Sequence, residues 1–154
     1  MTLSGEKLKT MNQGLLVLFY AAFIALIVFL FVIGSPLLLP ILITDGIGFV
    51  AVSLFRRFYN APRPYEVSEV PPAFSKDTSG KSFPSRHGFS AFMIAFSWLF
   101  VCLPVGLVLV AAAALLSWVR VTARVHFPRD VIAAAVIAAL FAAAGILPFY
   151  LFFQ

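Results

Sequence analysis

The chain has 154 residues, of which 62% are hydrophobic and 11% are charged. Soluble domains carry about 25% charged residues, and a short chain has too little interior to hide so much apolar surface from water. The 18 Phe exclude a disordered chain, and the single cysteine, Cys102, excludes a disulfide scaffold. We therefore predict an all-α integral membrane protein, a polytopic bundle of about five transmembrane helices, with no nucleic acid among its partners.

Five apolar segments approach the roughly 20 helical residues that a bilayer core requires. In chain order they are residues 14–33, 37–55, 87–103, 105–119 and 131–153. The breaks between them are Gly34-Ser35-Pro36, the polar segment 56–86, a turn at Pro104 and the charged segment 120–130. The fifth segment is rich in Ala, which suits close helix contact in lipid, and Pro148 is expected to kink it. We predict one membrane domain over 1–154, with an N-terminal span at 14–33 and a motif-bearing core at 37–153.

All 11 Lys and Arg lie before the first span, in residues 56–86 or in residues 120–130. Five spans place these three segments on the same side of the membrane. The positive-inside rule would make that side cytoplasmic. The alternative is that many of these residues bind an anion, in which case their number does not report orientation.

His87 ends the run Phe83-Pro84-Ser85-Arg86-His87, at the start of the third predicted span. Proline is favoured at the first position of a helix, so Ser85, Arg86 and His87 are expected in the first turn. The backbone N–H groups of a first helical turn are unpaired and attract anions. This segment is therefore a candidate anion site that includes a titratable side chain.

His126 lies just before Pro128, which marks the start of the fifth predicted helix, and Asp130 falls in the first turn of that helix. A carboxylate beside an imidazole fixes the imidazole tautomer and stabilises its cation, which suits a nucleophilic or basic histidine. The alternative is that Asp130 only caps the helix and complements its dipole.

Four arginines at the ends of three spans are candidates for a phosphate site, because a guanidinium matches phosphate oxygens two at a time. They are Arg56, Arg63, Arg86 and Arg120. Gathered at one point they would repel each other, which implies an anionic partner. For five other basic residues we favour contact with lipid headgroups: Arg57, Lys76, Lys81, Arg124 and Arg129. The acidic residues are scattered, so we expect no metal site and no cofactor; Asp45, inside a span, stays unassigned.

Three short motifs together resemble the signature of the type 2 phosphatidic acid phosphatase (PAP2) superfamily of membrane lipid phosphatases. The family pattern is Lys-x6-Arg-Pro, then Pro-Ser-Gly-His, then Ser-Arg-x5-His-x3-Asp. Residues 56–64 read Arg-x6-Arg-Pro, residues 84–87 read Pro-Ser-Arg-His, and residues 119–130 read Val-Arg-x5-His-x3-Asp. Many family members have six spans, so the resemblance implies that this chain lacks one N-terminal helix but keeps all the catalytic helices.

The resemblance implies a role for each matching residue. His126 would be the nucleophile that forms a phosphohistidine, Asp130 would orient it, and His87 would protonate the leaving oxygen and then activate water. The phosphoryl oxygens would be held by backbone N–H groups near Arg86 and by four side chains: Arg56, Arg63, Ser85 and Arg120. Such catalysis consists largely of positioning and electrostatic stabilisation, and needs no metal.

The resemblance also implies a function at the membrane surface. The expected activity is removal of a terminal phosphate from a bacterial envelope lipid: lipid A 1-phosphate, undecaprenyl diphosphate, phosphatidylglycerophosphate or phosphatidic acid. The expected location is the inner membrane with a periplasmic active site, against the positive-inside count. Two alternatives stay open, namely a lipid-to-lipid phosphotransferase and a non-enzymatic subunit that binds or transports anionic lipids.

Overall fold

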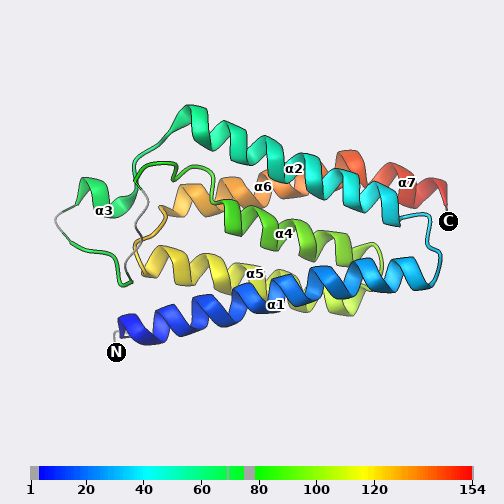
Figure 1. Ribbon diagram of the computed structural model, residues 1–154, viewed down its shortest axis with the longest axis horizontal. Coiled ribbons are helices and arrows are strands. Elements are labelled where there is room, and N and C mark those ends of the chain that lie inside the picture. The colour runs from blue at the N-terminus through cyan, green and yellow to red at the C-terminus, as the bar shows by residue number, and fades with distance from the viewer. Residues whose placement is uncertain (1–3, 69, 75–78, 154) are drawn as a thin grey trace.

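The computed structural model describes residues 4–68, 70–74 and 79–153, and this part of the chain is all-α. The long helices run along the long axis of the molecule, with the N-terminus at one end and the C-terminus at the other (Figure 1). The predicted helix bundle is confirmed. The helices are α1 (Gly5–Val32), α2 (Leu38–Tyr59), α3 (Pro64–Val67), α4 (Arg86–Leu99), α5 (Leu103–Thr122), α6 (Pro128–Gly145) and α7 (Leu147–Phe152).

Four apolar stretches are long enough to cross a membrane, as expected of a multi-pass membrane protein: Gly5–Val32, Leu38–Val67, Leu103–Thr122 and Pro128–Phe152. The first of these is longer than the predicted span 14–33. Ser4 caps α1 with its side chain, which accepts the Lys7 N–H, and the helix then begins at Gly5. The residues before Gly14 thus form extra turns of helix, and they bring Asn12 into the bundle.

The predicted third span, 87–103, is the exception, because α4 ends at Leu99 and has only 14 residues. That length corresponds to about 21 Å of helix, against a hydrocarbon core of about 30 Å. This short helix lies at the centre, where it packs against α1, α2, α5 and α6. Its side chains, such as Phe89 and Met93, are buried in the main apolar core. The surrounding helices therefore shelter α4 from the lipid.

Three proline predictions have different outcomes. Pro84 lies before α4 instead of starting it, because Ser85 is the N-cap. Pro104 lies within the first turn of α5, and the chain turns at residues 100–102 instead. Pro148 does mark a break in the last span, since α6 ends at Gly145 and α7 starts at Leu147.

Two contacts hold α2 against its neighbours inside the bundle. Gly145 of α6 lies so close to Thr44 of α2 that a Cβ at residue 145 would overlap the Thr44 side chain. One residue along, the buried carboxyl of Asp45 accepts a hydrogen bond from the Ser97 hydroxyl of α4, with Oγ–Oδ1 at 3.1 Å. Asp45, which the sequence left unassigned, therefore pairs with another helix.

Candidate active site

The basic ends of the helices and the loops between them enclose a cavity of about 560 Å³. No carboxylate is among its described lining residues, so the cavity is strongly cationic. Such a cavity favours an anion and disfavours a metal cation. Its lining consists of Ser53, Arg56, Arg57, Arg63, Ser79, Lys81, Arg86, His87, Arg120 and His126.

His126 lies between a carboxylate and a guanidinium. Its Nδ1 is 3.4 Å from Oδ2 of Asp130, and its Nε2 is 3.5 Å from Nη2 of Arg120. Only 2% of the residue is exposed. A proton on Nδ1 is assigned from this network, because a carboxylate is an acceptor only. With Nδ1 protonated, Nε2 is the acceptor, so Nη2 of Arg120 donates to it, and Nε2 is the ring nitrogen closest to the arginines of the cavity.

Burial lowers the pKa of His126 from 6.5 to about 3. The positive charges of Arg120 and Arg63 act in the same direction, whereas the hydrogen bond to Asp130 opposes them. A lowered histidine pKa means that the imidazole is neutral at pH 7. A neutral imidazole has the free lone pair that a nucleophile requires.

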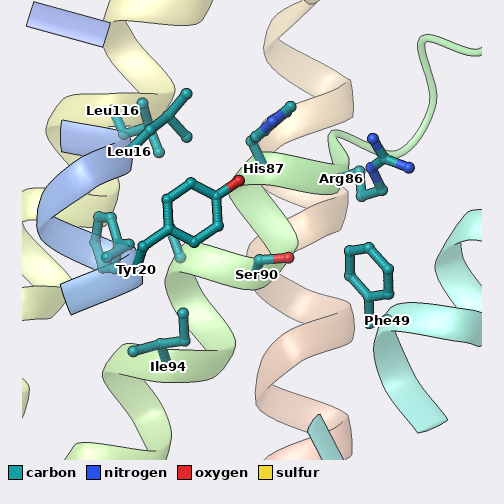
Figure 2. A pocket seen from close by; sticks show the side chains of 10 residues that line it. Leu16, Tyr20, Phe49, Arg86, His87, Ser90, Ile94 and Leu116 are labelled. Atoms are coloured by element: carbon teal, nitrogen blue, oxygen red, sulfur yellow. The ribbon is translucent and has the colours of Figure 1, made fainter. Parts of the chain in front are cut away.

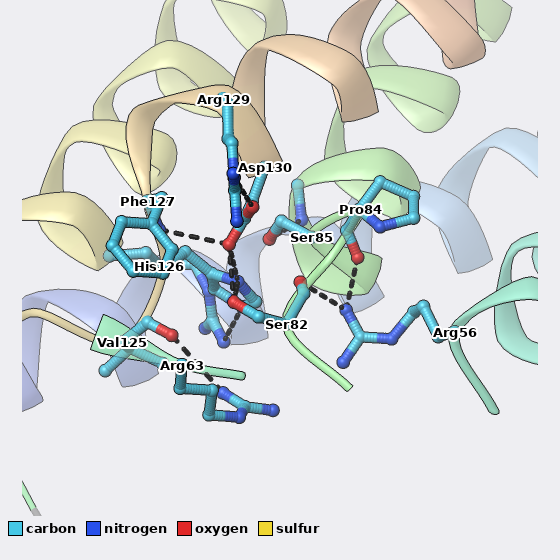
Figure 3. Close-up of polar contacts among 12 residues, drawn as sticks. Arg56, Arg63, Ser82, Pro84, Ser85, Val125, His126, Phe127, Arg129 and Asp130 are labelled. Atoms are coloured by element: carbon cyan, nitrogen blue, oxygen red, sulfur yellow. Dashed lines mark hydrogen bonds and ion pairs between the residues drawn. The ribbon is translucent and has the colours of Figure 1, made fainter. Parts of the chain in front are cut away.

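Asp130 is completely buried at the start of α6 and faces three donors with one oxygen. Its Oδ2 accepts from the Phe127 backbone N–H at 3.0 Å and from the Ser82 hydroxyl at 2.5 Å, and it also faces His126 (Figure 3). Capping the helix and holding the imidazole are thus compatible roles of one carboxylate. From the sequence alone, these two roles of Asp130 were alternatives.

Ser82 is a residue of this network that the sequence analysis did not single out. It is fully buried, and its Oγ is 3.4 Å from Nδ1 of His126 as well as hydrogen-bonded to Asp130. It comes directly before Phe83-Pro84-Ser85, inside the polar segment 56–86. A serine in a polar loop has no spacing that distinguishes it from other loop serines, so only the fold identifies it.

Two of the four arginines hold the loops around the cavity. Nη1 of Arg56 donates to the backbone carbonyls of Ser82 and Pro84 (Figure 3). Arg63 donates from Nε to the carbonyl of Gly80 at 2.9 Å and from Nη1 to that of Val125 at 3.3 Å. Both residues also line the cavity. Each guanidinium therefore donates hydrogen bonds to the protein backbone and also contributes positive charge to the cavity.

The other two arginines differ in exposure. Arg120 is 1% exposed, and its Nη1 donates to Oδ1 of Asn12 at 2.9 Å. Arg86 is exposed and its guanidinium carbon lies 5.5 Å from the centre of the Phe49 ring. Both line the cavity, together with His87.

Ser85, which the sequence predicts to hold a phosphoryl oxygen, is the N-cap of α4. It is fully buried, its Oγ accepts the Gly88 N–H at 3.3 Å, and its own N–H donates to the Asp130 carbonyl at 2.9 Å. It is not among the described residues that line the cavity. Ser85 thus caps α4 and joins the starts of α4 and α6.

The residues assigned to lipid headgroups separate into three groups. Arg57 and Lys81 line the cavity, so they contribute to its charge. Arg124 and Arg129 are exposed and lie outside the described lining. Lys76 lies outside the described residues.

An apolar groove adjoins the cavity and shares Arg86 and His87 with it. Figure 2 shows Tyr20 of α1 reaching toward α4 below His87, with Phe49 of α2 beside Arg86. A second apolar pocket of about 380 Å³ shares Tyr20 and Phe49 with this groove and extends along α4. The cationic cavity therefore borders an apolar path between α1, α2 and α4.

Comparison with known proteins agrees with this geometry. The structure is similar to the crystal structure of Aquifex aeolicus LpxE, with a TM-score of 0.67 and 27% sequence identity over 94% of this chain and 95% of that chain. It has the same fold as a PAP2-type phosphatidylglycerolphosphate phosphatase from Bacillus subtilis, with a TM-score of 0.68 and 22% identity over 94% of this chain and 75% of that one. No curated protein sequence matches the chain. The family model of the PAP2 superfamily matches residues 17–152, and the chain belongs to this superfamily.

Proposed function

We propose that the protein is a metal-independent lipid phosphatase that removes a terminal phosphate from a bacterial envelope lipid through a phosphohistidine. The observation that carries this proposal is the position of His126. Its Nδ1 faces the carboxylate of Asp130, and its Nε2 faces the cationic cavity beside Arg120. Family membership and the similarity to membrane phosphatases support the same reaction class.

The first chemical step in this proposal is attack of the His126 Nε2 lone pair on phosphorus. A nitrogen–phosphorus bond forms as the bond between phosphorus and the lipid oxygen breaks. His87 gives its proton to the departing oxygen, and Asp130 stabilises the positive charge on the His126 ring. The arginines that line the cavity stabilise the equatorial phosphoryl oxygens, where negative charge accumulates in the transition state.

The second step is hydrolysis of the phosphohistidine. His87, now neutral, accepts a proton from water as the water oxygen attacks phosphorus. The nitrogen–phosphorus bond breaks, inorganic phosphate leaves, and His126 is again neutral. The low pKa of His126 favours this step, because the cavity disfavours the imidazolium form.

The substrate class follows from the apolar path beside the cavity. The groove lined by Tyr20, Phe49 and Ile94 offers an apolar surface to a hydrocarbon chain whose phosphate lies in the cavity. We propose lipid A 1-phosphate as the first substrate to test, followed by undecaprenyl diphosphate, phosphatidylglycerophosphate and phosphatidic acid. We further propose that the protein resides in the inner membrane with the active site on the periplasmic side.

The experiment that tests this function is release of inorganic phosphate from each lipid by the purified protein in detergent. We expect release from at least one of them, inhibition by vanadate, and loss of turnover in His126→Gln. The matched control is Gln13→His, since it exchanges the same two residue types at an exposed position of α1. Activity that survives in a folded His126→Gln variant would show that another residue is the nucleophile.

The same assay separates the two alternatives. A phosphotransferase would move phosphate from one lipid to another without releasing it, which radiolabelled lipid pairs would reveal. A binding or transport subunit would bind lipid phosphates but give neither release nor transfer in wild type.

A further inference from the structure

The first helix carries one polar residue on its buried face, although it contains none of the three motifs. The buried residues of α1 are Leu8, Asn12, Phe19, Leu26 and Leu30, so Asn12 interrupts an otherwise apolar seam. Asn12 is 8% exposed. A buried amide without a partner costs free energy, and polar residues inside membrane helices mark functional contacts.

The partner of Asn12 is Arg120. Nη1 of Arg120 donates to Oδ1 of Asn12 at 2.9 Å, and Nη2 of the same guanidinium is 3.5 Å from Nε2 of His126. Because a guanidinium is planar, fixing Nη1 also fixes the direction of Nη2. The first helix is thus linked through one side chain to the atom that would attack phosphorus.

Asn12 supports Arg120 without neutralising it. No ion pair of Arg120 occurs among the described residues, and its Nε has no hydrogen-bond partner there. The positive charges of Arg63, Arg56 and Arg86, which also line the cavity, repel that of Arg120. A buried guanidinium with a neutral acceptor keeps its full attraction for an anion.

We propose that Asn12 is a positioning residue of the active site, which orients Arg120 toward the phosphoryl group and leaves its charge uncompensated. The proposal rests on the proposed phosphatase function. It explains why the acceptor is an amide: a carboxylate of the same size would make the same hydrogen bond but would form an ion pair with Arg120. That pair would compete with the phosphate for the guanidinium.

The decisive variant is Asn12→Asp, which keeps the shape and the acceptor oxygen but adds a negative charge. The matched control is Gln13→Asp, which adds the same charge at the next, exposed position of α1. We expect Asn12→Asp to fold, with a melting temperature at or above that of wild type in phosphate-free buffer. We also expect kcat/KM to fall by about 10- to 100-fold, as for other losses of a positioned charge at a reacting centre. Inhibition by inorganic phosphate and by vanadate should weaken in parallel, and Gln13→Asp should match wild type in all three measurements.

A second variant covers the case in which Asn12→Asp does not fold. Asn12→Leu keeps the volume and suits the membrane but removes the acceptor. We expect kcat to fall about tenfold and vanadate inhibition to weaken. Leu30→Ala, which loosens the same buried face near the other end of α1, should lower the melting temperature while kcat and vanadate inhibition are retained.

The outcomes distinguish this proposal from the proposed function. If Asn12 were merely structural, Asn12→Asp would hydrolyse lipid and bind vanadate as wild type does, and that result would overturn the proposal. Wild-type activity in a folded Asn12→Leu would overturn it as well. If wild type hydrolyses no lipid, the phosphatase function fails, and the proposal is then decided by thermal shift: phosphate and vanadate should stabilise wild type and Gln13→Asp but not Asn12→Asp.

Discussion

Ser82 Oγ donates to Oδ2 of Asp130 at 2.5 Å, and the same carboxylate oxygen lies 3.4 Å from Nδ1 of His126. A loop hydroxyl therefore fixes the carboxylate that in turn fixes the imidazole. Hydrogen bonds to charged groups are worth about 1.5–3 kcal/mol, so this contact is strong enough to control where the carboxylate points.

Replacing Ser82 by Ala should lower kcat by about tenfold or more, because Asp130 would lose a donor and hold His126 less firmly. Phosphate release from the best lipid substrate measures this. Ser68→Ala, at an exposed position outside the described cavity lining, is the matched control and should leave kcat unchanged. A Ser82→Ala enzyme as fast as wild type would mean that the Phe127 N–H alone positions the carboxylate.

The pKa of His126 predicts how stability depends on pH. In the unfolded chain this histidine binds a proton below about pH 6.5, whereas in the folded protein it does so only near pH 3. The unfolded state therefore binds more protons between these values, and the folded state loses stability as pH falls below about 6.5. The slope from this one group is at most about 1.4 kcal/mol per pH unit.

Thermal unfolding of wild type and His126→Gln, measured in detergent from pH 7.5 to pH 4.5, tests this dependence. As pH falls, the wild type should lose more stability than His126→Gln. Parallel curves would contradict the burial of a neutral imidazole.

Arg56 is predicted to combine a structural role with a role in binding. Arg56→Met would remove a cation from the cavity and leave the carbonyls of Ser82 and Pro84 without this donor, so kcat/KM should fall on the order of 100-fold. Arg56→Lys keeps the positive charge but has a single nitrogen to donate to both carbonyls and to the substrate. Its kcat/KM should therefore fall less than that of Arg56→Met. Lys9→Met, the loss of an exposed charge on α1, is the control. Equal losses in Arg56→Lys and Arg56→Met would show that charge at this position is unimportant.

Orientation can be tested with single cysteines in a Cys102→Ser background. Ser68 is exposed at the end of the molecule that carries the cavity, and Ser35 lies in the turn at the other end. We expect a membrane-impermeant maleimide to label Ser68→Cys in intact spheroplasts, and Ser35→Cys only after permeabilisation. The reverse pattern would place the active site in the cytoplasm, as the positive-inside count indicates.

The sequence was sufficient for the membrane class, the all-α bundle and the cluster of His126, Asp130 and the arginines. Apolar segments and motif spacing are local features, so they can be read without a structure. Ser82 and Asn12 could not be found in this way, because their partners lie 48 and 108 positions along the chain. The burial of Ser85 was also not visible in the sequence, because it results from its place at the N-cap of α4 and from its contact with the start of α6.

The length of α4 could not be predicted from the sequence either. Residues 100–103 are as apolar as the helix that precedes them, so composition alone extends the third span to Leu103. What ends the helix is the turn at residues 100–102, which leads into α5. A helix enclosed by its neighbours is not required to match the bilayer thickness, so the length rule for membrane spans does not apply to it.

The close contact of Gly145 with Thr44 lies on the two helices that also carry residues at the cavity end of the bundle. These residues join α6 to α2 at the end opposite the active site, and the same two helices carry Asp130 and Arg56. Any side chain at residue 145 would force α2 and α6 apart there and so change the angle between them. Over about 18 Å of helix, a small change of angle becomes a displacement of Arg56 relative to Asp130. The lack of a side chain at residue 145 thus lets α2 and α6 pack closely at the end of the bundle far from Asp130 and Arg56.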